Sequence, residues 1–405
     1  MNAAIETIDG GTVTTPAGFH AGATAAGIKG TGGEEPDLGI LFSETPCSAA
    51  GVFTTSRIRS APVRLSSRHL QDGRAQAVVV NSGCANSSTG QKGLADAAEM
   101  AALVARDLGI APEDVLVAST GVIGWYLPME RIAAGLRCIS LSPAGGHDLA
   151  RAMMTTDTRP KEAAVRATAA GTGFSIGGVA KGSGMIHPEM ATMLAFLTTD
   201  AAVEPGFLRA ALRRAASLSF NMVTVDGETS PSDTVFLLAN GLAGNGPITA
   251  ASPAAAPFQQ ALERVCVALA KMIARDGEGA SRLIEVTVSG AASQQDAVSG
   301  ARAIAGSPLW KAAVYGRDPN WGRIVAALGY SGAEVEEERL DISLAGVPVL
   351  GGGVPRPFDR EELSRRLSAG EVTISVNLNL GEASATAWGC DLTEEYVAIN
   401  SHYTT

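Results

Sequence analysis

The sequence predicts a mixed fold of the α/β or α+β class, with several sheets rather than one barrel. Short β-branched runs at residues 77–80 and 115–117 alternate with segments in which apolar residues recur at helical spacing. Later, residues 372–380 (VTISVNLNL) alternate between apolar and polar, which is typical of a strand with one buried face. Alternating strands and helices favour sheets that are covered by helices.

The individual elements follow from periodicity and end signals. Apolar residues on one face predict helices over about 94–108, 206–218 and 257–274. Asp359, an N-cap residue with Glu362 three positions later, predicts the start of another helix. Strands are expected at residues 77–80, 114–117, 283–288 and 372–380, and the charged run 334–339 is expected to be a solvated face.

Composition limits the class of protein. The 405 residues are 46% hydrophobic and 18% charged, which is typical of a soluble globular protein of roughly two to three domains. The net charge is -10 and basic residues are scattered, so neither nucleic acid nor an anionic membrane is expected as a partner. No apolar run approaches the roughly 18–20 residues that span a bilayer, and MNAAIETIDGG lacks the features of a secretory signal.

The cysteines and histidines do not indicate a metal site or a disulfide framework. Five cysteines lie far apart without a CxxC pair, and the five histidines form no HxxxH-type pair. We therefore expect no metal and a reduced, cytoplasmic setting.

Polar glycine-rich loops follow several strands, where α/β proteins commonly place their sites. In residues 118–124 (ASTGVIG), backbone N–H groups could point toward a common oxyanion. The same segment could instead form an ordinary turn. Residues 181–184 (KGSG) lack the full phosphate-loop pattern, but Lys181 could hold a carboxylate.

Two further segments are rich in charged turn residues. Residues 275–279 (RDGEG) place acidic groups at a helix C-terminus, against the helix dipole, so either a cationic ligand or a solvated turn is expected there. Residues 316–323 (GRDPNWGR) could form a binding loop or a rigid corner with an internal Arg–Asp pair.

Thr192 stands where a glycine- and proline-containing loop becomes an apolar strand. His187 is five residues away, and the intervening Pro188 makes their geometry unpredictable, so a catalytic triad has little support. If the chain is cut between Ala191 and Thr192, however, the threonine gains an α-amine with a pKa near 8. That amine could act as the base for the threonine's own hydroxyl.

Ordered motifs along nearly the whole chain resemble those of the ornithine acetyltransferase (glutamate N-acetyltransferase) family. They are GGTVTTPAGFHAGATAAGIK, NSGCANSSTG, ASTGVIG, MTTDTRPK, VAKGSGMIHPEMATML, SFNMVTVDGETSPSD, RDGEG, VYGRDPNWGRI and YVAINSHYTT. The resemblance implies a fold like that of the N-terminal-nucleophile hydrolases, with its own α/β topology.

By this resemblance, the precursor cuts itself between Ala191 and Thr192 into an α chain (1–191), with the oxyanion hole and the Lys181 loop, and a β chain (192–405). Thr192 becomes the nucleophile, and Thr120 with Gly121 forms the oxyanion hole. The implied substrate-binding residues are one of two threonines, Thr155 or Thr158, together with Lys181, Thr192, Glu278, Asn400 and Thr405.

The implied reaction moves acetyl from N2-acetyl-L-ornithine to L-glutamate through acetyl-Thr192, by a ping-pong mechanism. It yields L-ornithine and N-acetylglutamate, as in the cyclic pathway of arginine biosynthesis. Lys181 would pair the substrate carboxylate and Glu278 its ammonium. No cofactor is expected, acetyl-CoA is a candidate co-substrate of a bifunctional enzyme, and the expected assembly is an α2β2 heterotetramer.

Three alternatives remain open at this point. Cys84 replaces an asparagine usual in the family, and His187 and Glu189 lie in a variable part of the cleavage loop, which leaves room for an acetyltransferase of secondary metabolism. The second alternative is an N-terminal-nucleophile amidohydrolase or aminopeptidase. The third is a non-catalytic metabolite-binding protein in which Thr192 is an ordinary strand residue.

Overall fold

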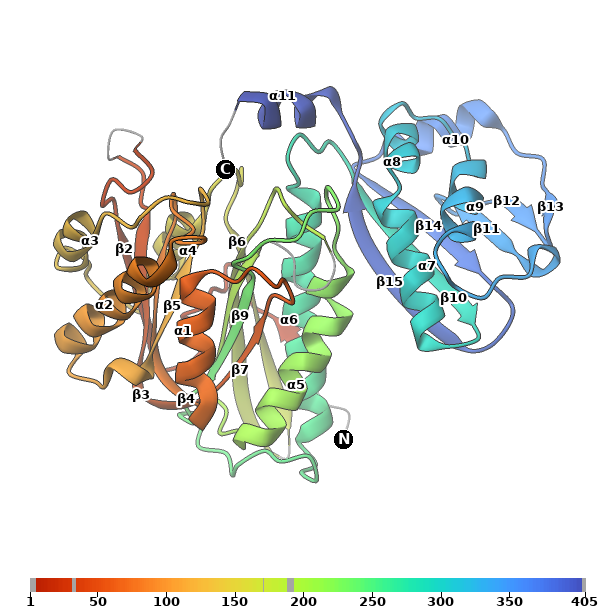
Figure 1. The fold of residues 1–405 in the computed structure, drawn as a ribbon. Coiled ribbons are helices and arrows are strands. Elements are labelled where there is room, and N and C mark those ends of the chain that lie inside the picture. The colour runs from red at the N-terminus through yellow and green to blue at the C-terminus, as the bar shows by residue number, and fades with distance from the viewer. Residues whose placement is uncertain (1–4, 31–33, 170, 188–192, 403–405) are drawn as a thin grey trace.

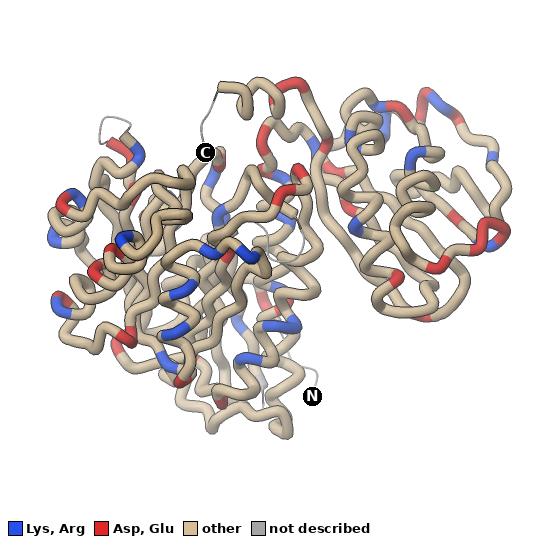
Figure 2. The backbone as a smooth tube through the Cα atoms, viewed as in Figure 1, with Lys and Arg blue, Asp and Glu red and all other residues tan. Residues whose placement is uncertain are grey.

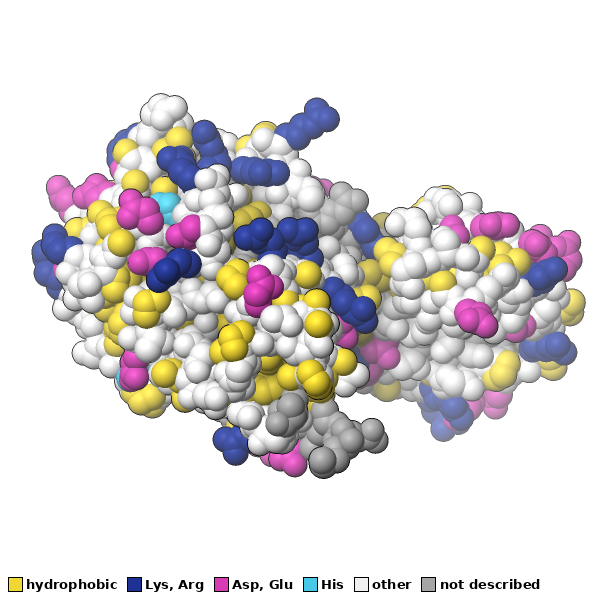
Figure 3. Space-filling model, turned by 90° about the horizontal axis from the view of Figure 1, so that it is seen from below, with side chains coloured by type: hydrophobic (Ala, Val, Ile, Leu, Met, Phe, Trp, Pro, Cys, Tyr) yellow, Lys and Arg dark blue, Asp and Glu magenta, His cyan; other side chains and the backbone are white. Residues whose placement is uncertain are grey.

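The computed structural model describes residues 5–30, 34–169, 171–187 and 193–402. These residues form two lobes of unequal size, each built on its own sheet (Figures 1 and 3). The larger lobe has a nine-stranded sheet and the smaller lobe a six-stranded sheet, and helices cover both. The predicted mixed α/β, multi-sheet architecture is confirmed.

The larger lobe contains the first nine strands and six helices. The strands are β1 (Ile5–Thr7), β2 (Phe19–Thr24), β3 (Leu38–Phe53), β4 (Arg74–Asn81), β5 (Val115–Ser119), β6 (Lys161–Ala169), β7 (Thr172–Lys181), β8 (Leu194–Thr199) and β9 (Thr234–Ala239). The helices are α1 (Ala61–His69), α2 (Gly90–Leu108), α3 (Met129–Leu136), α4 (Gly146–Met153), α5 (Pro205–Leu218) and α6 (Ala255–Arg275).

The strand order of the large sheet is β1-β6-β7-β8-β9-β3-β4-β5, with β2 paired to β3 beside this path. The pairs β8–β9 and β4–β5 are parallel, and the β7–β8 pair is antiparallel. The Ala191–Thr192 bond therefore lies in the connection between two neighbouring strands, with residues 188–192 outside the described part of the chain. The division into two lobes does not follow the division into residues 1–191 and 192–405.

The central strands are apolar because both of their faces are covered. On β4, Val78 and Val80 pack in the cluster that includes α4, whereas Ala77 and Val79 pack on the opposite side, with α1, α2 and α3. This two-sided burial explains why residues 77–80 form a continuous apolar run rather than an alternating one.

The smaller lobe contains β10 (Leu283–Ala291), β11 (Asp341–Leu344), β12 (Val347–Gly351), β13 (Val354–Pro355), β14 (Glu371–Asn377) and β15 (Ala383–Cys390), in the order β13-β12-β11-β14-β10-β15. Its helices are α7 (Gln294–Gly306), α8 (Pro308–Tyr315), α9 (Gly322–Gly329) and α10 (Arg360–Arg366). The acidic side chains of the run 334–339 are exposed on this lobe, as predicted.

The predicted helices are confirmed as α2, α5, α6 and α10. The Asp359 carboxylate accepts the backbone N–H groups of Glu361 and Glu362 at 2.9 and 3.0 Å, which is the predicted N-cap. The strand predicted over residues 372–380 is wrong at its end, because β14 stops at Asn377. Asn379 has a left-handed φ of 54°, which breaks the extended conformation.

A final helix, α11 (Glu394–His402), lies across the top of the molecule, above the region where the two lobes meet (Figure 1). Among the described residues no helix combines the length and apolar character needed to cross a membrane.

Candidate active site

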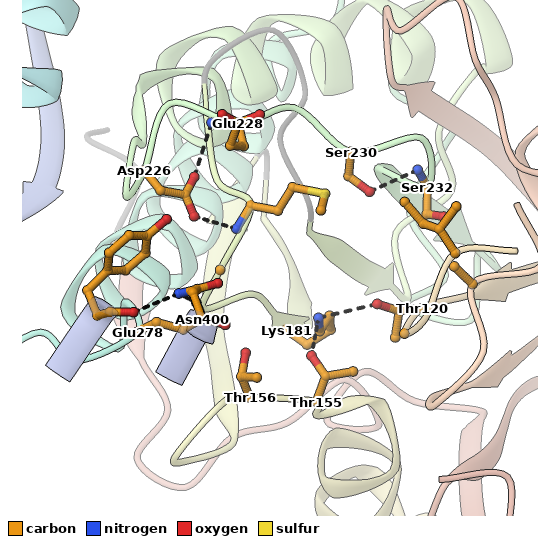
Figure 4. A pocket seen from close by; sticks show the side chains of 16 residues that line it. Thr120, Thr155, Thr156, Lys181, Asp226, Glu228, Ser230, Ser232, Glu278 and Asn400 are labelled. Atoms are coloured by element: carbon orange, nitrogen blue, oxygen red, sulfur yellow. Dashed lines mark hydrogen bonds between the residues drawn. The ribbon is translucent and has the colours of Figure 1, made fainter. Parts of the chain in front are cut away.

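A cavity of about 110 Å³ opens where the loops after β5, α4, β7 and α6 meet the C-terminal helix α11 (Figure 4). Its lining residues are Ala85, Thr120, Gly121, Ile123, Thr155, Thr156, Lys181, Gly184, Met185, Asp226, Glu228, Ser230, Ser232, Glu278, Tyr396 and Asn400. Six residues that the sequence predicted from five separate motifs are thus brought together: Thr120, Gly121, Thr155, Lys181, Glu278 and Asn400. The cavity is the candidate active site.

The loop after β5 is held in a shape that only glycine permits. The Thr120 N–H donates to the Asn81 carbonyl at 3.0 Å, and the Val122 N–H donates to the Gly83 carbonyl at 3.3 Å. Gly121 lies between them with φ of 125°, and a Cβ there would collide with the backbone of Gly83. No described residue accepts the Gly121 N–H, so this donor and the Thr120 hydroxyl are available at the cavity wall.

Lys181, the last residue of β7, supplies the buried positive charge of the cavity. Its Nζ donates to the Thr155 hydroxyl at 2.8 Å and to the Thr120 hydroxyl at 3.3 Å (Figure 4). Burial lowers the pKa of Lys181 below its ordinary value, and the Asp157 carboxylate, 3.9 Å from Nζ, opposes that shift. Lys181 is therefore a buried cation with room for an anionic ligand beside it.

A second lysine, fully buried behind the cavity, fixes the loops that carry these groups. Lys161 Nζ lies 2.6 Å from an oxygen of Asp157 and 2.6 Å from an oxygen of Asp276. Burial alone would raise the pKa of Asp157, but Lys181 and Lys161 outweigh it and lower the pKa to about 2. Asp276 ends α6, so the internal lysine compensates its charge at the helix C-terminus.

The two predicted threonines lie in different surroundings. The Thr158 hydroxyl and backbone N–H both donate to Asp276, and Thr158 does not line the cavity. Thr155 does line it and accepts a hydrogen bond from Lys181. Of these two threonines, Thr155 is therefore the one that lies at the cavity, and Thr156 of the same motif lines it as well.

The opposite end of the cavity is acidic (Figure 4). Glu278 accepts the Asn400 side-chain N–H at 2.8 Å, which ties α11 to the loop after α6. Asp226 and Glu228 also line this end. Burial raises the pKa of Tyr396 to about 12, with Asp226 and Glu278 adding to the shift. The cavity thus separates a cationic end from an anionic end.

The motif SFNMVTVDGETSPSD supplied no individual site residue at the sequence level, yet it provides Asp226, Glu228, Ser230 and Ser232 to the lining. It also provides Asp233, which is fully buried and accepts the Met193 N–H at 3.0 Å. The other oxygen of Asp233 has no hydrogen-bond partner among the described residues. Burial raises the pKa of Asp233 well above its ordinary value. This carboxyl group therefore contacts the backbone of the second residue of the proposed β chain.

Other sequence predictions concern residues that the structure does not describe, or residues that do not line the cavity. Ala191, Thr192 and Thr405 lie outside the described residues. Residues 316–323 form the corner between α8 and α9, and Asp318 pairs with Arg360 at 2.7 Å, so the ion pair is not internal to the motif. Cys84 is buried behind the loop, where its thiol donates to the Trp125 carbonyl.

The lowered pKa of Lys181 predicts a loss of substrate affinity at alkaline pH. The lysine loses its proton at a pH below 10.5, the ordinary pKa of a lysine. With the proton it loses the positive charge that holds a carboxylate. The kcat/KM of the proposed transfer should therefore fall on the alkaline side, through a rise in KM. In Lys181→Arg the charge persists, so the fall should move to higher pH. An identical alkaline limb in both proteins would assign that limb to another group.

Comparison with known proteins gives the chain its family. The model of the ArgJ family matches residues 20–405. The chain belongs to the ArgJ family. This confirms the resemblance to the ornithine acetyltransferases that the sequence motifs indicated.

Relatives match this ArgJ-family chain over its length. It is 54% identical to an arginine biosynthesis bifunctional protein ArgJ of Dehalococcoides mccartyi, with 100% of both chains covered. It is 55% identical to the protein of the same name from Symbiobacterium thermophilum, over 98% of this chain and 99% of the relative.

Two solved structures each match about half of this chain. A solved argJ chain of Bacillus halodurans is 49% identical, with a TM-score of 0.50, and the match covers 51% of this chain and 97% of that one. An ornithine acetyltransferase of Mycobacterium tuberculosis, solved with ornithine, is 39% identical, with a TM-score of 0.43, over 46% of this chain and 98% of that one.

Proposed function

We propose that the chain is a glutamate N-acetyltransferase of arginine biosynthesis, which moves acetyl from N2-acetyl-L-ornithine to L-glutamate through acetyl-Thr192. The observation that carries the proposal is the cavity with Lys181 at one end, Glu278 at the other and the Thr120–Gly121 donors on its wall. Acetylornithine has a carboxylate and an ammonium group at opposite ends, and the cavity presents the complementary charges in the same arrangement.

Each end of the cavity contributes to binding. A charge-assisted hydrogen bond from Lys181 to the substrate carboxylate, and one from the substrate ammonium to Glu278, contribute about 1.5–3 kcal/mol each. Asp226 and Glu228 add negative potential at the ammonium end. Because both contacts are made to groups other than the acetyl group itself, they fix the position of the reacting carbonyl.

The chemistry proceeds by two acyl transfers. The Thr192 hydroxyl oxygen attacks the acetyl carbonyl, its proton passes to the free α-amine of Thr192, and the oxyanion accepts hydrogen bonds from the Thr120 hydroxyl and the Gly121 N–H. The C–N bond then breaks, and ornithine leaves with that proton on its amine. The amine of glutamate attacks acetyl-Thr192, which releases N-acetylglutamate and restores the threonine hydroxyl.

Cleavage between Ala191 and Thr192 is part of the proposal, because only a free α-amine can serve as the base. A solved relative covers about half of this chain while being matched almost completely itself, as a chain cut near its middle would be. We further propose a cytoplasmic enzyme of two α and two β chains that uses neither a metal nor an organic cofactor.

The proposal is tested by measuring ornithine release from N-acetylornithine with and without glutamate. Transfer predicts continuous ornithine release and equal N-acetylglutamate formation when glutamate is present. Without glutamate, it predicts one equivalent of ornithine and an acetylated β chain in the intact mass. Continuous release of acetate without an acceptor would instead identify an amidohydrolase and overturn the transferase assignment.

The oxyanion donors can be tested separately. Thr120→Val removes the hydroxyl donor while keeping a β-branched side chain, and it should lower kcat by about 10²–10³-fold with KM little changed. The same substitution also removes one acceptor from Lys181, so Thr155→Val serves as the matched control. Since Thr155 contacts Lys181 but is not proposed as an oxyanion donor, its replacement should act mainly on KM. Equal losses of kcat in both variants would remove Thr120 from the oxyanion hole.

A further inference from the structure

A buried carboxyl group near the proposed cleavage bond has no role in the acyl transfers described above. Asp233 immediately precedes β9 and is fully buried. Figure 2 shows most charged residues of the larger lobe on the helices and loops around its sheet, so a carboxyl group inside the lobe is an exception. Because burying a carboxylate without a partner is costly, its presence indicates that it meets another group at this place.

A described residue occupies only one of the two carboxyl oxygens of Asp233. Oδ1 accepts the Met193 N–H at 3.0 Å, whereas Oδ2 is buried and has no hydrogen-bond partner in the described part of the chain. The Thr54 hydroxyl does not serve Oδ2, because it donates to the Ser230 carbonyl at 2.8 Å. One oxygen of Asp233 is therefore available to a donor next to Met193.

Covalent geometry places the reacting atoms of self-cleavage near this carboxyl group. Met193 follows Thr192 directly in the sequence. Standard bond lengths keep the nitrogen of Thr192 within about 4 Å of the Met193 nitrogen, and its hydroxyl oxygen within about 5 Å, in every conformation of residue 192. The hydrogen bond from Met193 therefore holds the Asp233 carboxyl group close to the two atoms that exchange a proton when the chain cuts itself.

The segment that carries Asp233 also holds the chain on the other side of the cleavage bond. Asp226 accepts the N–H groups of Met185 and Ile186 at 2.6 and 2.9 Å, and Met185 has a left-handed φ of 57°. Both oxygens of Asp226 are engaged by these backbone groups. Of the two carboxyl groups that hold the ends of this connection, Asp233 alone keeps an oxygen without a described partner.

The surroundings of Asp233 make it a stronger base than an ordinary carboxylate. Burial raises its pKa well above 3.8, and the Met193 N–H and the Lys181 ammonium group offset this shift only in part. A base whose pKa lies nearer the working pH takes a proton from a hydroxyl more readily. His187, the histidine nearest to the bond in sequence, lines a different hollow beside α7, and its Nδ1 lies 3.3 Å from the Thr224 hydroxyl.

We propose that Asp233 carries the proton during self-cleavage between Ala191 and Thr192. This inference rests on the proposed function, of which that cleavage is a part. The Thr192 oxygen bonds to the Ala191 carbonyl carbon while the Asp233 carboxylate takes the hydroxyl proton. The bond between that carbon and the Thr192 nitrogen then breaks, and Asp233 returns the proton to the nitrogen. Water hydrolyses the resulting ester: its hydroxyl group stays on Ala191, and its remaining proton restores the Thr192 hydroxyl.

The test follows the cleavage of full-length chains that are labelled in a short cell-free translation, with the cut fraction read on a denaturing gel. Asp233→Asn keeps an oxygen for the Met193 N–H but cannot carry the proton, so cleavage should slow by at least about 10²-fold. Hydroxylamine, which splits esters, should not cut Asp233→Asn, because no ester forms. In the wild type, the cleavage rate should fall as the pH drops through the raised pKa of Asp233.

Asp200→Asn is the matched control, and it should cut at the wild-type rate. Asp200 is a buried aspartate that follows β8, and its two oxygens accept the N–H groups of Ser175 and Ala17 at 2.7 and 3.2 Å.

The inference is overturned if Asp233→Asn cuts as fast as the wild type, if hydroxylamine splits it at the Ala191–Thr192 bond, or if Asp200→Asn is equally slow. If Asp233→Asn does not fold, the wild type decides. A cleavage rate that stays constant across the acidic range in which the protein is folded then overturns the inference. A wild type that is never cut at this bond would instead overturn the processing step of the proposed function.

Discussion

Thr192→Ala is expected to remain a single chain of 41.3 kDa and to lose transfer activity completely. Without the hydroxyl, no N-to-O acyl shift can occur at the Ala191–Thr192 bond, and no acceptor for the acetyl group remains. Intact mass spectrometry of the purified protein, next to the wild type, gives the first result. Ornithine release from N-acetylornithine gives the second.

Thr192→Ser is the matched control for this variant. It keeps a hydroxyl on the same carbon, so cleavage and a reduced transfer activity should both persist. A wild type that remains uncut would contradict the processing step, and a Thr192→Ala protein that is cut at the same bond would show that another group performs it.

Lys161→Met should destabilise the protein by about 3–5 kcal/mol. The substitution leaves Asp157 and Asp276 buried without their common partner, and neither carboxylate can reach solvent. The free energy of unfolding is best measured in the Thr192→Ala background, where a single chain unfolds. Because the pKa of Asp157 is lowered to about 2, its share of the stability is present above its ordinary value of 3.8 and is lost only as the pH falls toward 2.

Lys271→Met is the matched control for Lys161→Met, because Lys271 also contacts two carboxylates. Lys271 lies 2.8 Å from Glu285 and 3.4 Å from Glu371, but its side chain is 34% exposed. Solvent screens such pairs, so the expected cost is about 0–1 kcal/mol. Similar losses in the two variants would show that burial is not what makes the Lys161 network important.

The parts of the fold that sequence predicted best are those in which one local rule decides the structure. Helices α2, α5 and α6 each have a continuous apolar face, and α10 begins at a side-chain cap. The strand at residues 372–380 was extended too far because its alternation continues past the point where Asn379 turns the backbone. Pattern alone does not contain that left-handed conformation.

The candidate site was predicted from motifs, and its arrangement required the fold. Motifs marked Thr120, Lys181 and Glu278, which lie up to 158 positions apart, but no local rule places three such residues around one cavity. Asp233 was missed because a lone aspartate before a strand resembles an ordinary turn residue. Its burial beside Met193 is visible only once β8 and β9 are paired.

The position of the Ala191–Thr192 bond has a consequence for biosynthesis. Strands β8 and β9 lie between β7 and β3, so residues from both sides of the bond interleave within one sheet. In the proposed mechanism Thr192 acts with the oxyanion donors at the end of β5, a strand of the same sheet, so it depends on that interleaving. Severing the bond removes a loop connection but no hydrogen bond of the β7–β8 ladder. Cleavage would then occur only in chains that have folded correctly. A newly synthesised chain that stalls or misfolds would remain uncut, and every molecule with a free N-terminal threonine would already have assembled its sheet.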